Sequence, residues 1–292
     1  MQNKQSSDSR EIPRPIKRIV RQRCGFGCVI CGKPLYEYDH IIDWAVTKKH
    51  RAEEITLLCD QHHKEKTNGL LPKAAIAAAN LDPHNLRQGV SKLYLLHYTG
   101  DEVKVVIGTN TFHGARRDGE IRSIPLIIDG VPLIELSTQG ECLFLNLVLF
   151  DKDNNTILII IDNELVYVPD PWDIQFVKRK LTIRQAHGNI LMEFQFNPPD
   201  EIVVTRGIAY CNGIKVLIKK KQVEFPWNGA VIGNNEIYGA VYGIVIGDQS
   251  TINDIIVLHS RFAVDYPKDK KRTIYNAFDL NFGKKGKEGK AK

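Results

Sequence analysis

The sequence predicts an α+β protein, in which an N-terminal metal-binding domain with helices precedes a mainly antiparallel all-β domain. Three observations predict this division. Two pairs of potential metal ligands, Cys28–Cys31 and Cys59–His62, lie close together near the N-terminus. Beyond residue 100, short runs of β-branched and aromatic residues alternate with turn residues, which is typical of antiparallel strands. At 292 residues, the chain also fits two domains better than one.

Helix and strand signals alternate in the first part of the chain. They predict a helix over Pro15–Arg23, a strand over Tyr36–Ile42, helices over Asp60–Thr67 and Pro72–Ala79, and a linker over Asp82–Gly89. Asn68-Gly69 separates the last two helices. The predicted divisions of the chain are a flexible N-terminus over residues 1–16, a compact domain over 17–88, an all-β domain over 89–267 and a basic tail over 268–292.

In the second part of the chain, apolar residues recur with a period of two. The predicted strands cover residues 103–107, 121–128, 143–150, 157–161, 181–184, 190–196, 202–205, 214–218 and 255–258. Turn signals such as Asp129-Gly130 and Asn212-Gly213 separate them. Many short strands with almost no helical periodicity predict a sandwich, a barrel or a solenoid. The sequence leaves these three architectures open.

Four soft ligands predict one structural zinc ion. Zinc in a closed structural site takes four Cys or His ligands in a tetrahedron, and Cys28, Cys31, Cys59 and His62 supply that set. A disulfide between the first two is a poor alternative, because short Cys-containing pairs with this spacing, in a chain without a signal peptide, favour a metal. Cys24 is expected to be a small buried residue. Such a knuckle alone also suits a module that only binds nucleic acid or protein.

Asp39, His40 and His63 are left over from the zinc set, and their chemistry suits metal-assisted hydrolysis. A carboxylate is a good ligand for a hard divalent cation. An imidazole with a near-neutral pKa is a good general base. A cation beside a phosphodiester contributes several kcal/mol of charge stabilisation. These three residues therefore predict a hydrolytic site next to the zinc.

In order and spacing, these residues resemble the HNH endonucleases, a family with the ββα-metal fold. The matching segments are Cys28-Val-Ile-Cys31-Gly32, Asp39-His40-Ile41, Leu57-Leu58-Cys59-Asp-Gln-His62-His63 and Lys66-Thr67. The resemblance covers residues 17–72, about a fifth of the chain. The family's central asparagine belongs five residues before Cys59, where this chain has Glu54. The Glu54 carboxylate either orients the catalytic histidine in place of that asparagine or lies in an exposed turn.

The resemblance implies a role for each matching residue. His40 would be the general base that takes a proton from the attacking water. Asp39 and His63 would hold a catalytic divalent cation, Mg²⁺ or another, beside the scissile phosphate. Lys66 and Arg51 would neutralise phosphate oxygens.

Charge is distributed unevenly along the chain. Residues 1–100 contain 16 Lys and Arg against 10 Asp and Glu, residues 101–267 contain 15 against 21, and residues 268–292 contain 9 against 3. Because cationic side chains drive affinity for nucleic-acid phosphates, DNA contacts are expected at the two ends of the chain. Along the first helix, the expected contacts are Arg14, Lys17, Arg18, Arg21 and Arg23. The acidic β domain is expected to bind a protein partner or a second copy of itself.

The composition argues against two other classes of protein. No run approaches the roughly 18–20 apolar residues that a membrane span needs, and the polar first ten residues lack the apolar stretch of a signal peptide. Of six cysteines, those outside the zinc set make no disulfide framework. We therefore expect a cytoplasmic protein that does not associate with membranes.

Together, these patterns predict a metal-dependent HNH endonuclease that hydrolyses DNA phosphodiester bonds. The β domain would target, regulate or oligomerise it. Such an architecture fits defence against foreign DNA or mobile-element biology. The alternative is a non-catalytic zinc knuckle fused to a β interaction domain, and the departure at Glu54 keeps this alternative open.

Overall fold

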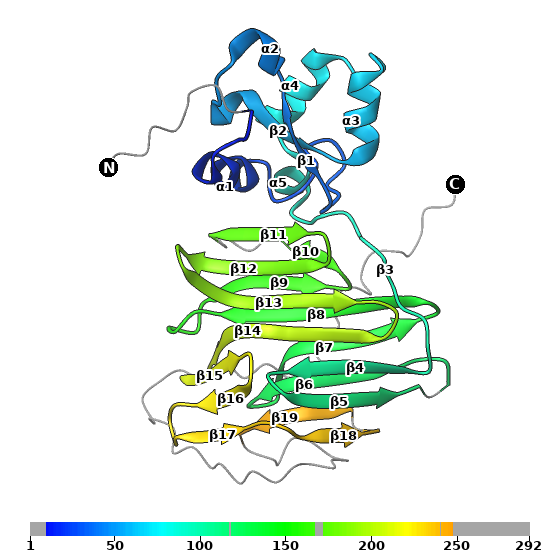
Figure 1. Ribbon diagram of the computed structural model, residues 1–292, viewed down its shortest axis with the longest axis vertical. Helices are drawn as coiled ribbons and strands as arrows, with labels where there is room; N and C mark the ends of the chain where they lie inside the picture. The colour runs from blue at the N-terminus through cyan, green and yellow to red at the C-terminus, as the bar shows by residue number, and fades with distance from the viewer. Residues whose placement is uncertain (1–9, 117, 167–171, 240, 248–292) are drawn as a thin grey trace, which may run out of the picture. The chain divides into compact units, whose positions relative to one another are not determined.

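The structure is a computed structural model that describes residues 10–116, 118–166, 172–239 and 241–247 (Figure 1). It is mostly β, with 48% strand and 17% helix. The chain divides into two compact units, which we call the knuckle unit (residues 1–94 and 164–189) and the β unit (residues 95–163 and 190–292). The predicted strand over 255–258, the basic tail over 268–292 and residues 1–9 lie outside the described residues. In the part of the chain described, no helix is both long and apolar enough to cross a membrane.

The knuckle unit begins with alternating helices and short strands. In chain order these are α1 (Arg14–Arg23), β1 (Glu37–His40), α2 (Trp44–Thr47), the 3₁₀ turn η1 (Ala52–Glu54), β2 (Ile55–Leu58), α3 (Asp60–Thr67), α4 (Lys73–Leu81) and α5 (His84–Gln88). β1 and β2 pair antiparallel, with Asp39 opposite Thr56 and His40 opposite Ile55. Cys59 alone separates β2 from α3. A two-stranded hairpin followed at once by a helix is thus the frame of this unit.

A small hydrophobic core holds this frame together. Its fully buried members come from α1 and its C-cap, from the turn before β1, from β2 and the residue after it, and from α4. They are Val20, Cys24, Cys28, Val29, Ile55, Leu57, Leu58, Cys59 and Ile76, so Cys24 is buried as predicted. β2 is buried along its whole length, so it is the central element of the unit. Two of the predicted zinc ligands, Cys28 and Cys59, are therefore also core residues.

A distant hairpin of the chain belongs to the knuckle unit. It consists of β11 (Asp173–Val177) and β12 (Lys180–Ala186), which pair antiparallel; β10 (Glu164–Val166) precedes it. Arg21 of α1 donates from Nε and Nη2 to the two carboxylate oxygens of Asp173 at 2.7 and 2.8 Å. The two side chains are only 6% and 4% exposed. Separating such a buried pair would leave an uncompensated charge on each side. This ion pair therefore holds the hairpin against α1.

Two of the arginines expected to contact DNA have structural roles instead. Arg21 is committed to Asp173 and also donates to the hydroxyl of Tyr38. Arg23 donates to the backbone carbonyls of Glu53 and Ile55. The sequence prediction was wrong for Arg21, because one turn of α1 faces the core and the hairpin rather than solvent.

The prediction of a linker over residues 82–89 was also wrong, because this segment contains the helix α5. Pro83 precedes the helix with φ of −62°, and Gly89 ends it in the left-handed region with φ of 69°, the usual asymmetry of helix ends. Asn85 is buried and donates from Nδ2 to the carbonyl of Gly25 at 2.8 Å. The sequence of a short segment between Pro and Gly does not reveal such a contact with a distant residue, so the local pattern indicated only a linker.

The β unit consists of two sheets. One contains β3 (Leu96–His97), β6 (Arg122–Ile128), β7 (Val131–Gln139), β8 (Cys142–Phe150), β9 (Thr156–Ile161) and β19 (Tyr242–Ile246). The other contains β4 (Glu102–Ile107), β5 (Asn110–Ala115), β13 (Asn189–Asn197), β14 (Glu201–Cys211), β15 (Ile214–Lys219), β16 (Gln222–Phe225), β17 (Ala230–Ile232) and β18 (Glu236–Tyr238). Most neighbouring strands are antiparallel; the parallel pairs are β4 with β14, β5 with β18 and β6 with β19.

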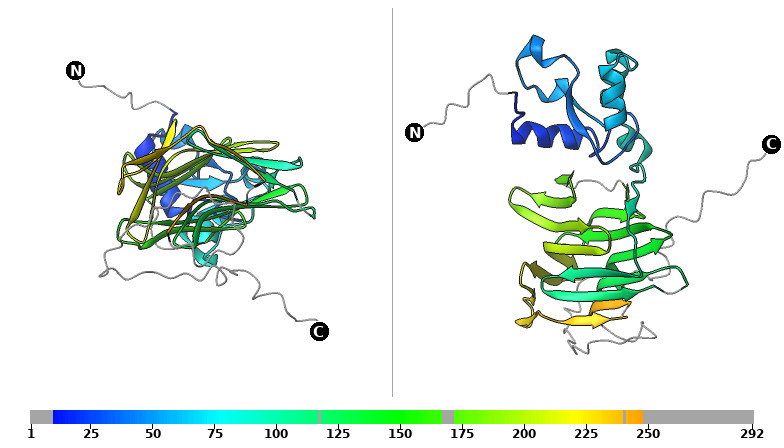
Figure 2. Two further views of the ribbon diagram at one scale, coloured as in Figure 1. Left: turned by 90° about the horizontal axis from the view of Figure 1, so that it is seen from below. Right: turned by 45° about the vertical axis from the view of Figure 1, so that its right-hand side comes forward.

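The two sheets pack face to face, as the views in Figure 2 show. Strands β4, β5 and β14 of one sheet lie against β6 and β8 of the other. Alternate residues of β8 and β14 are buried, as expected for strands with one face in a core. Neither sheet closes into a barrel within the described residues. At the predicted turn Asp129-Gly130, both residues have positive φ, 50° and 75°, which a tight hairpin connection between β6 and β7 requires.

Candidate functional site

The predicted zinc ligands come together at the start of α3. Cys28 and Cys31 lie in a tight turn, in which the amide of Gly32 donates to the carbonyl of Cys28 at 2.7 Å. Cys59 is the residue before α3, and His62 lies in the first turn of that helix. The four ligand atoms all lie within 4.8 Å of one another. This three-cysteine, one-histidine cluster can therefore hold a metal ion.

The distances within the cluster fit tetrahedral zinc. The Cys31 and Cys59 sulfurs are 3.8 Å apart, and His62 Nδ1 lies 3.4 Å from the Cys28 sulfur and 3.2 Å from that of Cys59. Zn–S and Zn–N bonds of about 2.3 and 2.05 Å give tetrahedral edges of about 3.8 Å between sulfurs and about 3.6 Å between sulfur and nitrogen. The four residues thus fit a structural zinc ion.

The cysteines of the cluster affect one another's acidity. A hydrogen bond from the Cys28 thiol lowers the pKa of Cys31 to about 5, and the same bond, with burial, raises the pKa of Cys28. Burial raises the pKa of Cys59. One thiolate is therefore already favoured at neutral pH, and thiolate is the form in which cysteine binds a metal.

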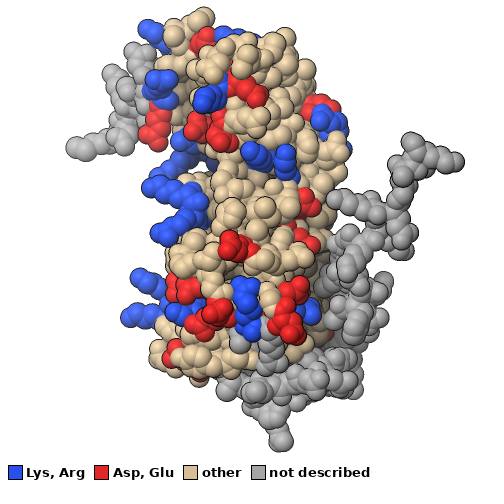
Figure 3. All heavy atoms as spheres, turned by 90° about the vertical axis from the view of Figure 1, so that its right-hand side faces the viewer, with Lys and Arg blue, Asp and Glu red and all other residues tan. Residues whose placement is uncertain are grey.

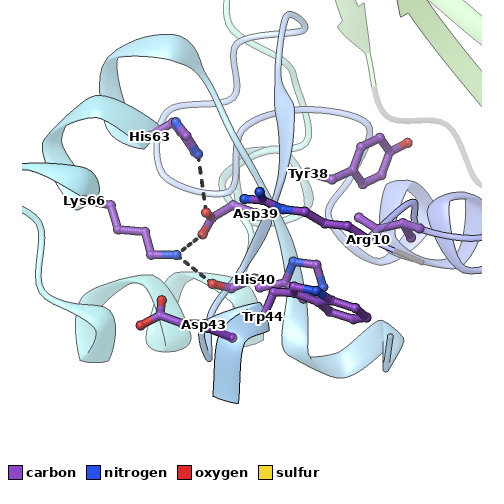
Figure 4. A pocket seen from close by; sticks show the side chains of 10 residues that line it. Arg10, Tyr38, Asp39, His40, Asp43, Trp44, His63 and Lys66 are labelled. Carbon is purple, nitrogen blue, oxygen red and sulfur yellow. Dashed lines mark hydrogen bonds and ion pairs between the residues drawn. The ribbon is translucent and has the colours of Figure 1, made fainter. Parts of the chain in front are cut away.

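A second group of predicted residues lines a pocket of the knuckle unit with a volume of about 440 Å³ (Figure 4). The lining residues are Arg10, Ile12, Tyr38, Asp39, His40, Asp43, Trp44, Ala45, His63 and Lys66. β1 supplies Asp39 and His40, while α3 supplies His63 and Lys66. Figure 4 shows both α3 side chains pointing toward Asp39. The fold thus gathers four predicted residues of the hydrolytic site in one pocket.

Asp39 is the centre of the polar contacts in this pocket. Its Oδ2 accepts from Lys66 Nζ at 2.5 Å, and its Oδ1 lies 3.5 Å from His63 Nε2. Lys66 Nζ also donates to the backbone carbonyl of His40 at 2.6 Å. Because Lys66 holds one oxygen, the other oxygen of the carboxylate is aimed at the imidazole.

His63 has a carboxylate beside each ring nitrogen. Its Nδ1 lies 3.7 Å from Glu37 Oε2, and its Nε2 faces Asp39. A proton on Nδ1, facing Glu37, leaves the Nε2 lone pair directed toward the Asp39 oxygen. Two such electron-rich atoms repel each other unless a proton or a cation lies between them. The pair is therefore chemically suited to a cation.

His40 contacts a histidine that the sequence analysis did not select. Its Nε2 lies 3.2 Å from Nδ1 of His50, and the His50 ring stacks on Trp44 with centroids 4.2 Å apart and an interplanar angle of 16°. Burial, and then the neighbouring His50, lower the pKa of His40. His40 is therefore held mainly in the neutral form that a general base needs.

Arg51 and Glu54 lie apart from these contacts. They form an ion pair with each other, Arg51 Nη1 to Glu54 Oε1 at 3.2 Å, and neither lines the pocket. The backbone carbonyl of Glu54 accepts from the amide of Ile41 at 2.9 Å, so this residue helps hold the β1–β2 hairpin. Of the six predicted residues outside the zinc cluster, these two are the ones that the structure does not bring into the pocket.

Sequence reasoning missed Arg10 and Trp44, which line the pocket, and His50, which contacts His40. Arg10 lies before α1, Trp44 begins the short helix α2, and His50 lies in the loop before η1, so none of them is part of a long periodic pattern. The only local signal for His50 was its place ten residues after His40. Such a signal is weak, because a lone histidine is common on surfaces.

Comparison of the chain with protein-family models, curated proteins and solved structures found no match. The geometry itself separates two sites in the knuckle unit. One is a closed cluster of four soft ligands, and the other is an open pocket with two carboxylates, two imidazoles and two cationic side chains. The first is suited to structural zinc and the second to acid–base or metal-assisted chemistry.

Proposed function

We propose that the chain is a metal-dependent endonuclease of the HNH type, which hydrolyses phosphodiester bonds in DNA. The observation that carries this proposal is the meeting of Asp39, His40, His63 and Lys66 in one pocket of a ββα frame. A zinc-type cluster lies on the same helix, and this pairing of a closed metal site with an open polar pocket supports a hydrolase over a purely structural knuckle.

The residues divide the work as follows. His40 takes a proton from the attacking water, since its imidazole is kept neutral by burial. Asp39 Oδ1 and His63 Nε2 would hold the divalent cation; their separation of 3.5 Å is near the roughly 3.0 Å between adjacent ligands of octahedral Mg²⁺. When bound, the cation supplies positive charge beside the phosphate and the leaving 3′-oxygen. Lys66 orients Asp39 by holding its other oxygen.

Arg10 is the best candidate for binding a phosphate oxygen. It is exposed, lines the pocket and faces the Asp39 and His40 side of it in Figure 4. A guanidinium can bind a phosphate through two parallel hydrogen bonds. In this proposal Arg10 takes over the role that the sequence analysis gave to Arg51.

DNA is the proposed substrate because the basic excess of the chain lies at its two ends, and the first 100 residues include the pocket. A protein partner or a second copy of the chain remains our prediction for the β unit. On the face of this unit shown in Figure 3, acidic and basic side chains lie interspersed. That pattern suits a protein surface better than a phosphate backbone, which needs a continuous basic stripe.

A plasmid-nicking assay tests the proposal. The full chain, loaded with zinc, is incubated with supercoiled DNA and Mg²⁺ or Mn²⁺, beside the variant His40→Ala. We expect nicking by the parent, none by the variant, and equal zinc content and equal DNA binding for both. His97→Ala, an exposed histidine of β3, is the matched control and should nick normally. A parent that binds DNA but never nicks it would support the alternative of a non-catalytic zinc module.

A further inference from the structure

In the family that this chain resembles, an asparagine five residues before the second pair of zinc ligands orients the general base, and this chain has no asparagine there. Glu54 stands at that position, but its carboxylate pairs with Arg51 and does not line the pocket. An imidazole without a fixed neighbour distributes its single proton between both ring nitrogens, so only part of the population presents the lone pair that a base needs. Some other group must choose the tautomer if His40 acts as a base.

His50 is the side chain whose ring nitrogen meets His40. The distance of 3.2 Å between His40 Nε2 and His50 Nδ1 is within hydrogen-bond range for two nitrogens. Only one of these two atoms can carry the proton between them. If His40 donates, its Nδ1 keeps a lone pair; if His50 donates, the Nε2 lone pair of His40 is used up.

The surroundings of His50 restrict how it can turn. Trp44 stacks on its ring at 4.2 Å, and the three rings of His40, Trp44 and His50 lie with centroids no more than 5.4 Å apart. The short helix α2 and the left-handed Lys48, with φ of 45°, bring the chain back so that this loop lies beside the end of β1. All three rings are partly buried. The contact between the two histidines is thus held in place by the packing of the three rings.

We propose that His50 is the positioning residue for His40. In this arrangement His50 Nδ1 accepts the Nε2–H of His40, so that the Nδ1 lone pair of His40 is free to take a proton from water, and Trp44 holds His50 in place. The inference rests on the proposed nuclease function for its consequence in catalysis, but the tautomer itself can be measured without activity.

The first test is the tautomer of His40 in the zinc-loaded full chain. Long-range proton–nitrogen correlation spectra of protein with ¹⁵N-labelled histidine show which ring nitrogen is protonated, and His40→Ala identifies the signals of that ring. At a pH where the rings are neutral, we expect the proton of His40 on Nε2. In His50→Phe, which keeps a ring against Trp44 but removes the acceptor, we expect a mixture of both tautomers. His50→Gln, which restores an acceptor, should recover the Nε2 form.

The second test is the rate of DNA nicking by the same variants. Loss of a group that orients a functional residue typically costs about 10- to 100-fold, so His50→Phe should lower kcat by that factor with KM and zinc content unchanged. His50→Gln should restore most of the rate, and Trp44→Leu, which leaves both histidines in place, should give an intermediate loss. If His50→Phe does not fold, Trp44→Leu and His50→Gln still provide the comparison.

Two results would overturn the inference. One is a His40 protonated on Nδ1, or one whose tautomer is unchanged in His50→Phe. The other is a His50→Phe variant that nicks DNA as fast as the parent. A parent that does not nick DNA at all counts against the proposed function, whereas the tautomer measurement still decides whether His50 positions His40.

Discussion

Two adjacent histidines of α3 belong to two different kinds of site. His62 faces the cysteines, and its side chain is 14% exposed; His63 faces Asp39 across the pocket, and its side chain is 38% exposed. The zinc-type cluster draws all four ligands from the chain, whereas the pocket offers two candidate ligands and leaves room for others. Structural metal sites are closed and catalytic ones keep open positions. The comparison teaches that neighbouring residues of one helix can face a closed cluster and an open pocket, because consecutive residues point about 100° apart around its axis.

The largest effect is expected from breaking the closed cluster. Cys59→Ser should abolish zinc binding and unfold the knuckle unit, because a structural zinc ion contributes about 10–16 kcal/mol of apparent binding free energy that is available only to the folded state. Metal analysis and hydrogen exchange measure the two losses. Cys142→Ser, at a cysteine of β8 outside the cluster, should change neither. Full zinc content in Cys59→Ser would show that the cluster is not the metal site.

The adjacent histidines offer a direct comparison between the two sites. His62→Ala should lose zinc and have a lower melting temperature. His63→Ala should keep its zinc and the melting temperature of the parent, but its nicking rate should fall by about 100-fold or more, as for other groups of the catalytic apparatus. Zinc content, thermal melting and nicking rate are measured on both variants. Equal loss of zinc in the two would mean that the sites are not separate.

A variant of Lys66 tests whether this side chain orients Asp39 in the open pocket. Lys66→Met keeps the length of the side chain but leaves Asp39 Oδ2 and the carbonyl of His40 without their common donor. We expect the nicking rate to fall by about 10- to 100-fold, the usual cost of losing a group that orients a ligand, while zinc content is unchanged. Lys64→Met, at the neighbouring lysine of the same helix, is the control. A normal rate in Lys66→Met would remove Lys66 from the site.

The smallest effect is expected at Glu54. Its ion pair with Arg51 lies outside the pocket, and the Arg51 side chain is 56% exposed, so the pair is worth no more than about 1 kcal/mol. Glu54→Gln should therefore change the nicking rate by less than about threefold, a factor that corresponds to under 1 kcal/mol. A large loss in this variant would restore Glu54 as the residue that orients His40, and would count against His50.

The local part of the site could be predicted because it depends on short spacings. Two residues between Cys28 and Cys31, and two between Cys59 and His62, are enough to bring each pair to one metal. The strand before His40 and the helix after Cys59 follow from their own sequence patterns, and β1 and α3 have nearly the predicted bounds. Alternation of apolar residues likewise predicted a second, mostly β region, without distinguishing a sandwich from a solenoid.

The sequence by itself determined the four candidate zinc ligands, the strand that contains Asp39 and His40, the helix after Cys59 and the candidate pocket residues. The second strand of the hairpin, β2, was not among the predicted elements. Only the tertiary structure decided that Arg21 is buried against Asp173, 152 residues away, that α5 replaces a linker, and that His50 rather than Glu54 meets His40. The physical reason is the range of the interactions. Spacing and periodicity act over one turn of a helix or one strand, whereas ion pairs, ring stacking and tautomer choice depend on which distant segments pack together.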